Sequence, residues 1–108
     1  MAHFLIQVTY TPEAWASMMH NPQSRRDAIQ PVIENLGGSI TGSWFALGEY
    51  DGVALLELPD NVSAAAFSLA CSASGALKSF KTTPLITNEE AMDAMGKANA
   101  SGYRPPSE

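Results

Sequence analysis

The sequence predicts an α+β fold in a single domain, and three observations support this. Two strand-like runs flank a short Gly- and Asp-containing connection between Gly38 and Asp60, which is the strongest hairpin signal in the chain. One further strand pattern precedes the hairpin and one follows it, with helical patterns between them. The chain has 108 residues, of which 45% are hydrophobic and 16% charged, as expected for one globular domain.

The N-terminal third is predicted to form one strand and two helical pieces. Residues Phe4–Tyr10 alternate between two faces, one of them apolar, as half-buried strands do. Thr11-Pro12 then supplies an N-cap and a proline at the first helical position. Asn21-Pro22 interrupts this helix, and a second one is expected over Gln23–Leu36. Gly37-Gly38 is predicted to end it in a left-handed cap.

Both strands of the predicted hairpin are apolar on both faces. Strict alternation places Ile40 and Trp44 on one face of the first strand and Phe45 on the other. The second strand reads Val-Ala-Leu-Leu-Glu-Leu over residues 53–58. A strand that is apolar on both faces has to be covered twice. We therefore expect helices on one face of the sheet and another subunit on the other.

The helix after the hairpin is predicted to begin at Asp60 or Asn61 and to end near Gly75. The spacing of its apolar residues predicts one stripe buried against the sheet. The members of this stripe are Val62, Ala66, Leu69, Ala70 and Ala73. Cys71, in the same helix, is interpreted as a small packing residue.

The predicted order is a ferredoxin-like βαββαβ pattern with a four-stranded antiparallel sheet plus a C-terminal helix. The last strand covers Leu77–Ile86, and Pro84 within it argues for an edge position. The C-terminal helix starts at a capping box, Thr87 to Glu90. We assign residues 1–100 to a single domain and residues 101–108 to an extended tail. Right-handed crossovers place both main helices on one face of the sheet.

Charge and composition argue against several classes of function. The formal net charge is −5, and the six Lys and Arg residues do not cluster beyond Arg25-Arg26, so nucleic-acid binding is not expected. The pair could clasp an anionic ligand, but partnering with Asp27 or Glu34, or simple solvation, is the favoured interpretation. A single cysteine, no signal-peptide pattern and no membrane-length apolar run predict a cytoplasmic protein without a membrane partner.

The hairpin also carries a short signature. Gly48-Glu49-Tyr50-Asp51, followed by an apolar strand ending in Glu57-Leu58-Pro59-Asp60 and an alanine-rich helix, resembles the GYD domain family. The similarity covers residues 3–90 and includes Phe4–Tyr10, Leu36-Gly37-Gly38 and Thr82-Thr83. The resemblance implies a dimeric α+β barrel, and hence a homodimer or a higher homo-oligomer. It implies no particular activity, because its relatives include ligand-binding modules, small isomerases and cofactor-free oxygenases.

Four of the six candidate ligand-contacting residues are strand residues. His3 and Gln7 share one face of the first strand, which would line the space between the two sheets of a dimer. Trp44 or its neighbour is expected to point toward the same region. Glu57 interrupts an apolar run, so that burial would raise the pKa of its carboxyl and suit it to acid–base work. A surface carboxylate paired with Lys78 or Lys81 is the favoured alternative.

The other two candidates, Tyr50 and Asp51, lie in the hairpin connection, where we favour a structural role. Asp51 is expected to accept hydrogen bonds from turn amides. Tyr50 would close the mouth of a barrel. Gly48 and Gly52 would supply positive φ angles at the two ends of the turn.

Two functions follow from these observations. The first is a small-molecule-binding or purely structural dimeric module, which the scarcity of ionisable strand residues favours. The alternative is a cofactor-independent enzyme, of isomerase or monooxygenase type, acting on a small apolar organic molecule in the inter-sheet cavity. No metal-ligand pattern and no cofactor motif is found, and no catalytic residue is assigned.

Overall fold

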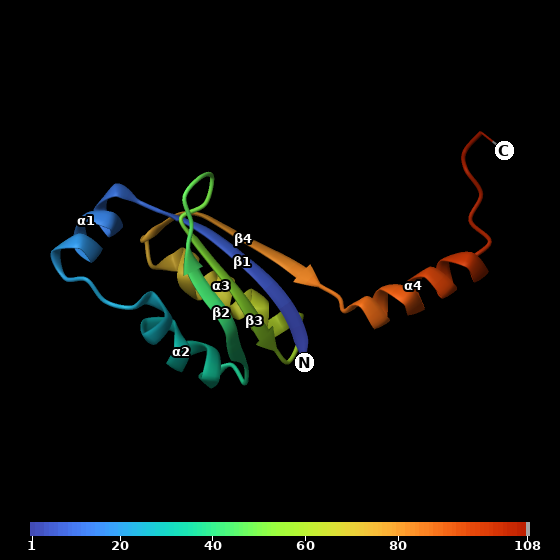
Figure 1. Ribbon diagram of the computed structural model, residues 1–108, viewed down its shortest axis with the longest axis horizontal. Helices are drawn as coiled ribbons and strands as arrows, with labels where there is room; N and C mark the ends of the chain where they lie inside the picture. Colours follow the sequence, from blue (N-terminus) through green and yellow to red (C-terminus); the bar gives the residue numbers. More distant parts are fainter. Residues whose placement is uncertain (108) are drawn as a thin grey trace.

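The computed structural model describes residues 1–107 as a twisted four-stranded antiparallel sheet with helices packed on one face (Figure 1). The strand order is β2-β3-β1-β4, as in ferredoxin-like folds. This confirms the predicted fold class and the edge position of the Pro84 strand. The elements are β1 (Ala2–Tyr10), α1 (Pro12–His20), α2 (Arg25–Asn35), β2 (Ser39–Phe45), β3 (Gly52–Leu58), α3 (Asn61–Ala73), β4 (Leu77–Leu85) and α4 (Asn88–Ala100).

Short-range signals fix the ends of the helices. The side chain of Thr11 accepts a hydrogen bond from the Ala14 amide, and that of Asp60 accepts one from the Ser63 amide. α4 starts at the predicted capping box. The backbone after α2 takes a φ of 84° at Gly37, the left-handed conformation that the glycine pair predicts.

The core lies between the sheet and the helices. Alternate residues of the two central strands are buried on that face, among them Phe4 and Ile6 of β1 and Leu56 of β3. Ile33 of α2 and Phe67 of α3 pack against them, and both are almost completely buried. These side chains fix the helices over the sheet, because each one removes a large apolar surface from water.

α3 is rotated away from its predicted orientation. Val62 and Leu69, both assigned to the buried stripe, are 77% and 71% exposed. Ala64 and Phe67 face the sheet instead, and the half-buried Cys71 continues that line one turn further on. Phe67 fixes this rotation, since it is the largest apolar side chain of the helix and gains most from burial.

β2 contains an irregularity that changes which face its residues occupy. The register shifts between Ile40 and Gly42, so that Ile40 pairs with Leu56 on the helix face, whereas Trp44 pairs with Val53 on the opposite face. The expectation that Ile40 and Trp44 share a face is therefore wrong. One extra residue in a strand, a β-bulge, reverses the facing of everything beyond it.

The face of the sheet opposite α2 and α3, here called the helix-free face, exposes apolar side chains. Leu5, Val53 and Leu55 are partly exposed at its centre, and Trp44 is 57% exposed beside them. The Trp44 indole lies over Gly42, where any β-carbon would overlap the ring. Phe45 is on the other face, where its ring packs against Trp15 of α1. The prediction that these two neighbours face opposite ways is confirmed.

α4 projects from the end of β4 away from the rest of the domain (Figure 1). Met92 and Met95 lie on this helix and are 69% and 64% exposed. Within residues 1–107, no helix is long and apolar enough to cross a membrane.

Candidate functional site

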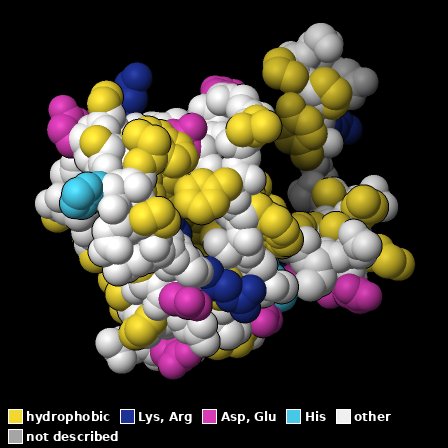
Figure 2. All heavy atoms as spheres, turned by 60° about the vertical axis from the view of Figure 1, so that its left-hand side comes forward, with side chains coloured by type: hydrophobic (Ala, Val, Ile, Leu, Met, Phe, Trp, Pro, Cys, Tyr) yellow, Lys and Arg dark blue, Asp and Glu magenta, His cyan; other side chains and the backbone are white. Residues whose placement is uncertain are grey.

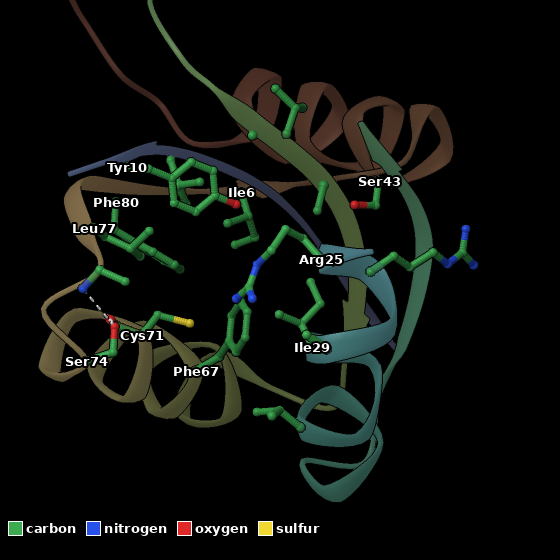
Figure 3. Close-up of a pocket in the computed structure, with 18 of the residues that line it drawn as sticks. Ile6, Tyr10, Arg25, Ile29, Ser43, Phe67, Cys71, Ser74, Leu77 and Phe80 are labelled. Atoms are coloured by element: carbon green, nitrogen blue, oxygen red, sulfur yellow. Dashed lines mark hydrogen bonds between the residues drawn. The ribbon is translucent and has the colours of Figure 1, made fainter. Parts of the chain in front are cut away.

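A cavity of about 440 Å³ lies on the helix side of the sheet, between α2 and α3 (Figure 3). The central strands β1 and β3 form its floor, together with part of β2. α2 and α3 form its two walls, and the start of β4 closes one end. Its volume falls within the range of small-molecule sites, about 300–1,000 Å³. Exposed residues such as Ala28 and Ser74 lie on its boundary, so the cavity is open to solvent.

The cavity exists because the floor carries small residues and the helices sit over opposite edges of the sheet. α2 packs mainly on β2 and α3 mainly on β4, so the two helices stand apart over the part of the central strands that forms the cavity floor. At that point the helix-facing residues are Ser43, Gly52 and Ala54, which fill little volume. A β-carbon on Gly52 would come within 2.9 Å of Val8 Cγ2, so the position requires glycine.

Aromatic rings line two sides of this space. The ring of Tyr10 packs edge-on against Trp15, with 5.4 Å between centroids, and at 6.4 Å from Phe45. On the α3 side, Phe67 and Phe80 make a second edge-on pair at 5.8 Å. Close contacts of this kind hold rings in fixed orientations. The cavity walls are therefore apolar and defined in shape.

Three functional groups converge inside the cavity. Figure 3 shows the Arg25 guanidinium reaching from the first turn of α2 into the space between Tyr10 and Phe67, and the Cys71 thiol pointing inward from α3. Burial raises the pKa of the Tyr10 hydroxyl, although Arg25 acts in the opposite direction. Burial likewise raises the pKa of the Cys71 thiol, again against Arg25. At neutral pH, the Tyr10 hydroxyl is therefore protonated and can donate a hydrogen bond, and the Cys71 thiol is uncharged.

Arg25 and Arg26 have no carboxylate partner among residues 1–107. The ion pair found there joins His3 and Glu57, and Glu34 accepts a hydrogen bond from Gln30 instead. Of the two favoured interpretations, pairing with Asp27 or Glu34 is therefore wrong, and solvation agrees with the exposure of Arg26. Figure 2 turns the α1 and α2 end of the molecule forward, and basic side chains lie there among acidic and exposed hydrophobic ones.

The predicted strand candidates lie on the other side of the sheet. His3, Gln7, Trp44 and Glu57 all belong to the helix-free face. His3 Nδ1 is 3.8 Å from Glu57 Oε1, with both side chains partly exposed, so the partner of Glu57 is this histidine and not Lys78 or Lys81. A smaller hollow of about 210 Å³ lies nearby, bordered by His3, Leu55 and Leu85. Their role in ligand contact remains a prediction.

Asp51 connects the end of the hairpin to β1. Its Oδ2 accepts a hydrogen bond from the Tyr10 amide at 3.0 Å, and its own amide donates to the Val8 carbonyl at 2.8 Å. The Asp51 carboxylate thus accepts from an amide of β1, at the point where the pairing of β1 with β4 becomes irregular. The expectation that it accepts from turn amides is wrong. A ladder that shifts register leaves amides unpaired, and Asp51 satisfies one of them.

The two glycines of the signature have different functions. Gly48 has a φ of 139°, as the turn prediction requires, but Gly52 has no positive φ and is needed for its close approach to Val8. Tyr50 is half-buried in the connection, and its side chain makes no hydrogen bond within residues 1–107.

The sequence patterns did not indicate Tyr10 or Cys71 as site residues, and for Arg25 they favoured an ion pair or solvation over a bound anion. Their signals are visible in retrospect. Tyr10 ends a strand whose other apolar residues are smaller, and Arg25 opens a helix at the end where the dipole disfavours cations. Residues 1–107 contain no group of three His, Cys, Asp or Glu side chains placed to hold a metal ion.

The fold and the cavity define a ferredoxin-like α+β domain with its own internal pocket. The sequence matches the family model of the GYD domain over residues 4–95, so the chain belongs to the GYD domain family. No curated protein and no solved structure gives a significant match to the chain.

Proposed function

We propose that this protein is a small-molecule-binding module whose ligand occupies the cavity between the sheet and helices α2 and α3. The observation that supports this is the cavity itself, with mostly apolar walls and a few polar groups aimed inward. Binding sites for small organic molecules have this composition, because apolar walls supply affinity and a few polar groups fix orientation. The proposed site is thus intramolecular, unlike the inter-sheet site that the sequence suggests.

The enzymatic alternative receives no specific support. Glu57 was its main acid–base candidate, and this side chain is partly exposed and lies beside His3 at a strand end. General acid–base catalysis also requires the group to reach a bound substrate. The proposal is therefore confined to binding.

A substitution that fills the cavity tests the proposed function. Because the Cys71 thiol points inward, the ring of a Cys71→Phe variant would occupy ligand space. With the uncharged apolar dye N-phenyl-naphthylamine as probe, we expect fluorescence titration to show affinity reduced by about 10-fold or more. The matched control is Leu69→Phe, which adds the same ring to the exposed face of α3. Equal dye affinity in wild type and Cys71→Phe, with both folded, would refute the proposal.

We further propose that two copies pair through their helix-free faces and function in the cytoplasm. The supporting observation for the pairing is the exposed apolar centre of that face, formed by Leu5, Trp44, Val53 and Leu55. An apolar patch on a rigid sheet is typical of an interface, and a second copy offers an identical apolar surface. The single cysteine suits a reducing compartment.

Two neighbouring substitutions test the dimer. Light scattering at micromolar concentration is expected to give twice the mass of the 108-residue chain. Trp44→Lys should convert the protein to monomers or aggregates, because it places a charge in the paired faces. Phe45→Lys, on the opposite face beside Trp15, should loosen α1 and leave the dimer intact. A wild-type monomer, or an intact Trp44→Lys dimer, would contradict the proposed interface.

A further inference from the structure

The charges around the cavity differ from those of the rest of the protein. The chain contains eleven Asp and Glu residues against six Lys and Arg, yet the charged residues that line the cavity are Arg25 and Arg26. Neither is paired with a carboxylate within residues 1–107. Arg25 is half-buried, and its guanidinium lies inside the cavity (Figure 3). An unpaired, partly desolvated cation attracts an anion more strongly than an exposed one, because screening by water is weaker.

The position of Arg25 in α2 adds a second argument. It is the first residue of an eleven-residue helix, where the positive end of the helix dipole disfavours cations. The last turn of the same helix, where a cation would be favoured, has no basic residue. Arg25 therefore goes against the preference of helices for acidic residues in the first turn. Residues that break such a local preference often have a functional role. A bound anion would remove the conflict, since the helix end and the guanidinium would both attract it.

We propose that the ligand of this cavity is an organic acid, with an apolar body held by the aromatic walls and an anionic group bound by Arg25 and Tyr10. This inference rests on the proposed function. The Tyr10 hydroxyl and the Arg25 guanidinium both point into the cavity (Figure 3), so both can donate to one anionic group. Burial keeps the hydroxyl protonated and the Cys71 thiol neutral at physiological pH. Neither group therefore repels the anion.

Two dyes with the same aromatic skeleton separate this inference from the proposed function. Anilinonaphthalene sulfonate carries an anionic group, whereas N-phenyl-naphthylamine is uncharged. Arg25→Met is expected to weaken binding of the sulfonate dye by about 10-fold to 100-fold, the usual loss for a charge-assisted hydrogen bond, and to change the uncharged dye by less than about threefold. Tyr10→Phe should weaken only the sulfonate dye, by about 3-fold to 10-fold.

Matched variants control for net charge and for folding. Arg104→Met removes the same charge from the exposed C-terminal segment and should leave both affinities unchanged. Arg25→Lys keeps the charge and should bind the sulfonate dye more tightly than Arg25→Met. If Arg25→Met fails to melt cooperatively, Arg25→Gln takes its place.

The outcomes are distinct. If Arg25→Met and Arg25→Gln bind the sulfonate dye like wild type, while Cys71→Phe loses the uncharged dye, the acid preference is wrong and the binding function stands. If Cys71→Phe changes neither dye, both the function and the inference fail. Selective loss of the sulfonate dye in the Arg25 variants, with Arg104→Met unaffected, supports the inference.

Discussion

Replacing Gly38 with alanine is expected to destabilise the protein by about 3 kcal/mol or more, the range reached by severe steric overlap in a packed region. Gly38 joins the end of α2 to β2 and lies against β3. A β-carbon there would overlap the carbonyl oxygen of Glu57 and come within 2.6 Å of Leu58 Cδ2. The carbonyl is main chain in a central strand, so it cannot rotate away. Chemical denaturation monitored by circular dichroism measures the loss directly.

Gly96 provides the matched control for this prediction. It lies in the middle of α4, and a β-carbon added there meets no atom within 4 Å. Gly96→Ala is expected to be neutral or to stabilise the protein by about 0.5–1 kcal/mol, because alanine loses less backbone entropy in a helix. A Gly38→Ala protein as stable as Gly96→Ala would show that β2 and β3 do not meet as described.

The second large effect is expected at Asp51. Asp51→Ala leaves the half-buried Tyr10 amide without an acceptor, which costs about 1–3 kcal/mol for an unsatisfied buried donor. Tyr10 sits at the edge of the cavity, so the same change should also weaken dye binding by loosening the ring. Thermal melts and dye titrations of the purified variant measure the two effects together.

Two neighbouring variants show whether the hydrogen bond is the cause. Asp51→Asn keeps a side-chain oxygen that can accept from the Tyr10 amide, so it should lose less stability than Asp51→Ala. Tyr50→Phe removes a hydroxyl that makes no hydrogen bond within residues 1–107 and should have a smaller effect still. If Asp51→Ala melts like wild type but loses ligand binding, Asp51 contacts the ligand and the structural role assigned to it is wrong.

Much of the fold was predictable because short-range chemistry determines it. Thr11, Asp60 and Thr87 each cap a helix by accepting from the amide three residues further on, and such contacts are visible in the sequence. The edge position of β4 followed from Pro84 alone. In each case a single residue type restricts the backbone, without any contribution from distant parts of the chain.

The errors arose where distant segments decide the outcome. The bulge near Gly42 depends on how β2 pairs with β3, and it moved Ile40 to the face opposite Trp44. The rotation of α3 depends on Phe67 finding space over the sheet. Neither the bulge nor the rotation depends on a local pattern. Alternation along β2 therefore predicted the wrong face for Ile40, and apolar spacing along α3 predicted the wrong buried stripe.

The cavity was not predicted for a related reason. Four of the six candidates are strand residues chosen for a space between two sheets, and their role in ligand contact stays a prediction, whereas the large cavity lies under the helices. The cavity floor lies low because three small residues, Ser43, Gly52 and Ala54, are neighbours on two paired strands. Only the register of β2 against β3 brings them together. Likewise, the direction of the Arg25 side chain depends on where α2 lies relative to Tyr10, which no sequence pattern specifies.

The central claim, that the ligand site lies between the sheet and helices α2 and α3, is tested most directly by intermolecular nuclear Overhauser effects. The sample is methyl-labelled protein saturated with N-phenyl-naphthylamine. We expect cross-peaks from the dye to the Ile29 and Leu77 methyls, which face the cavity. Cross-peaks confined to the Leu5 and Leu55 methyls would place the dye on the helix-free face and contradict the claim.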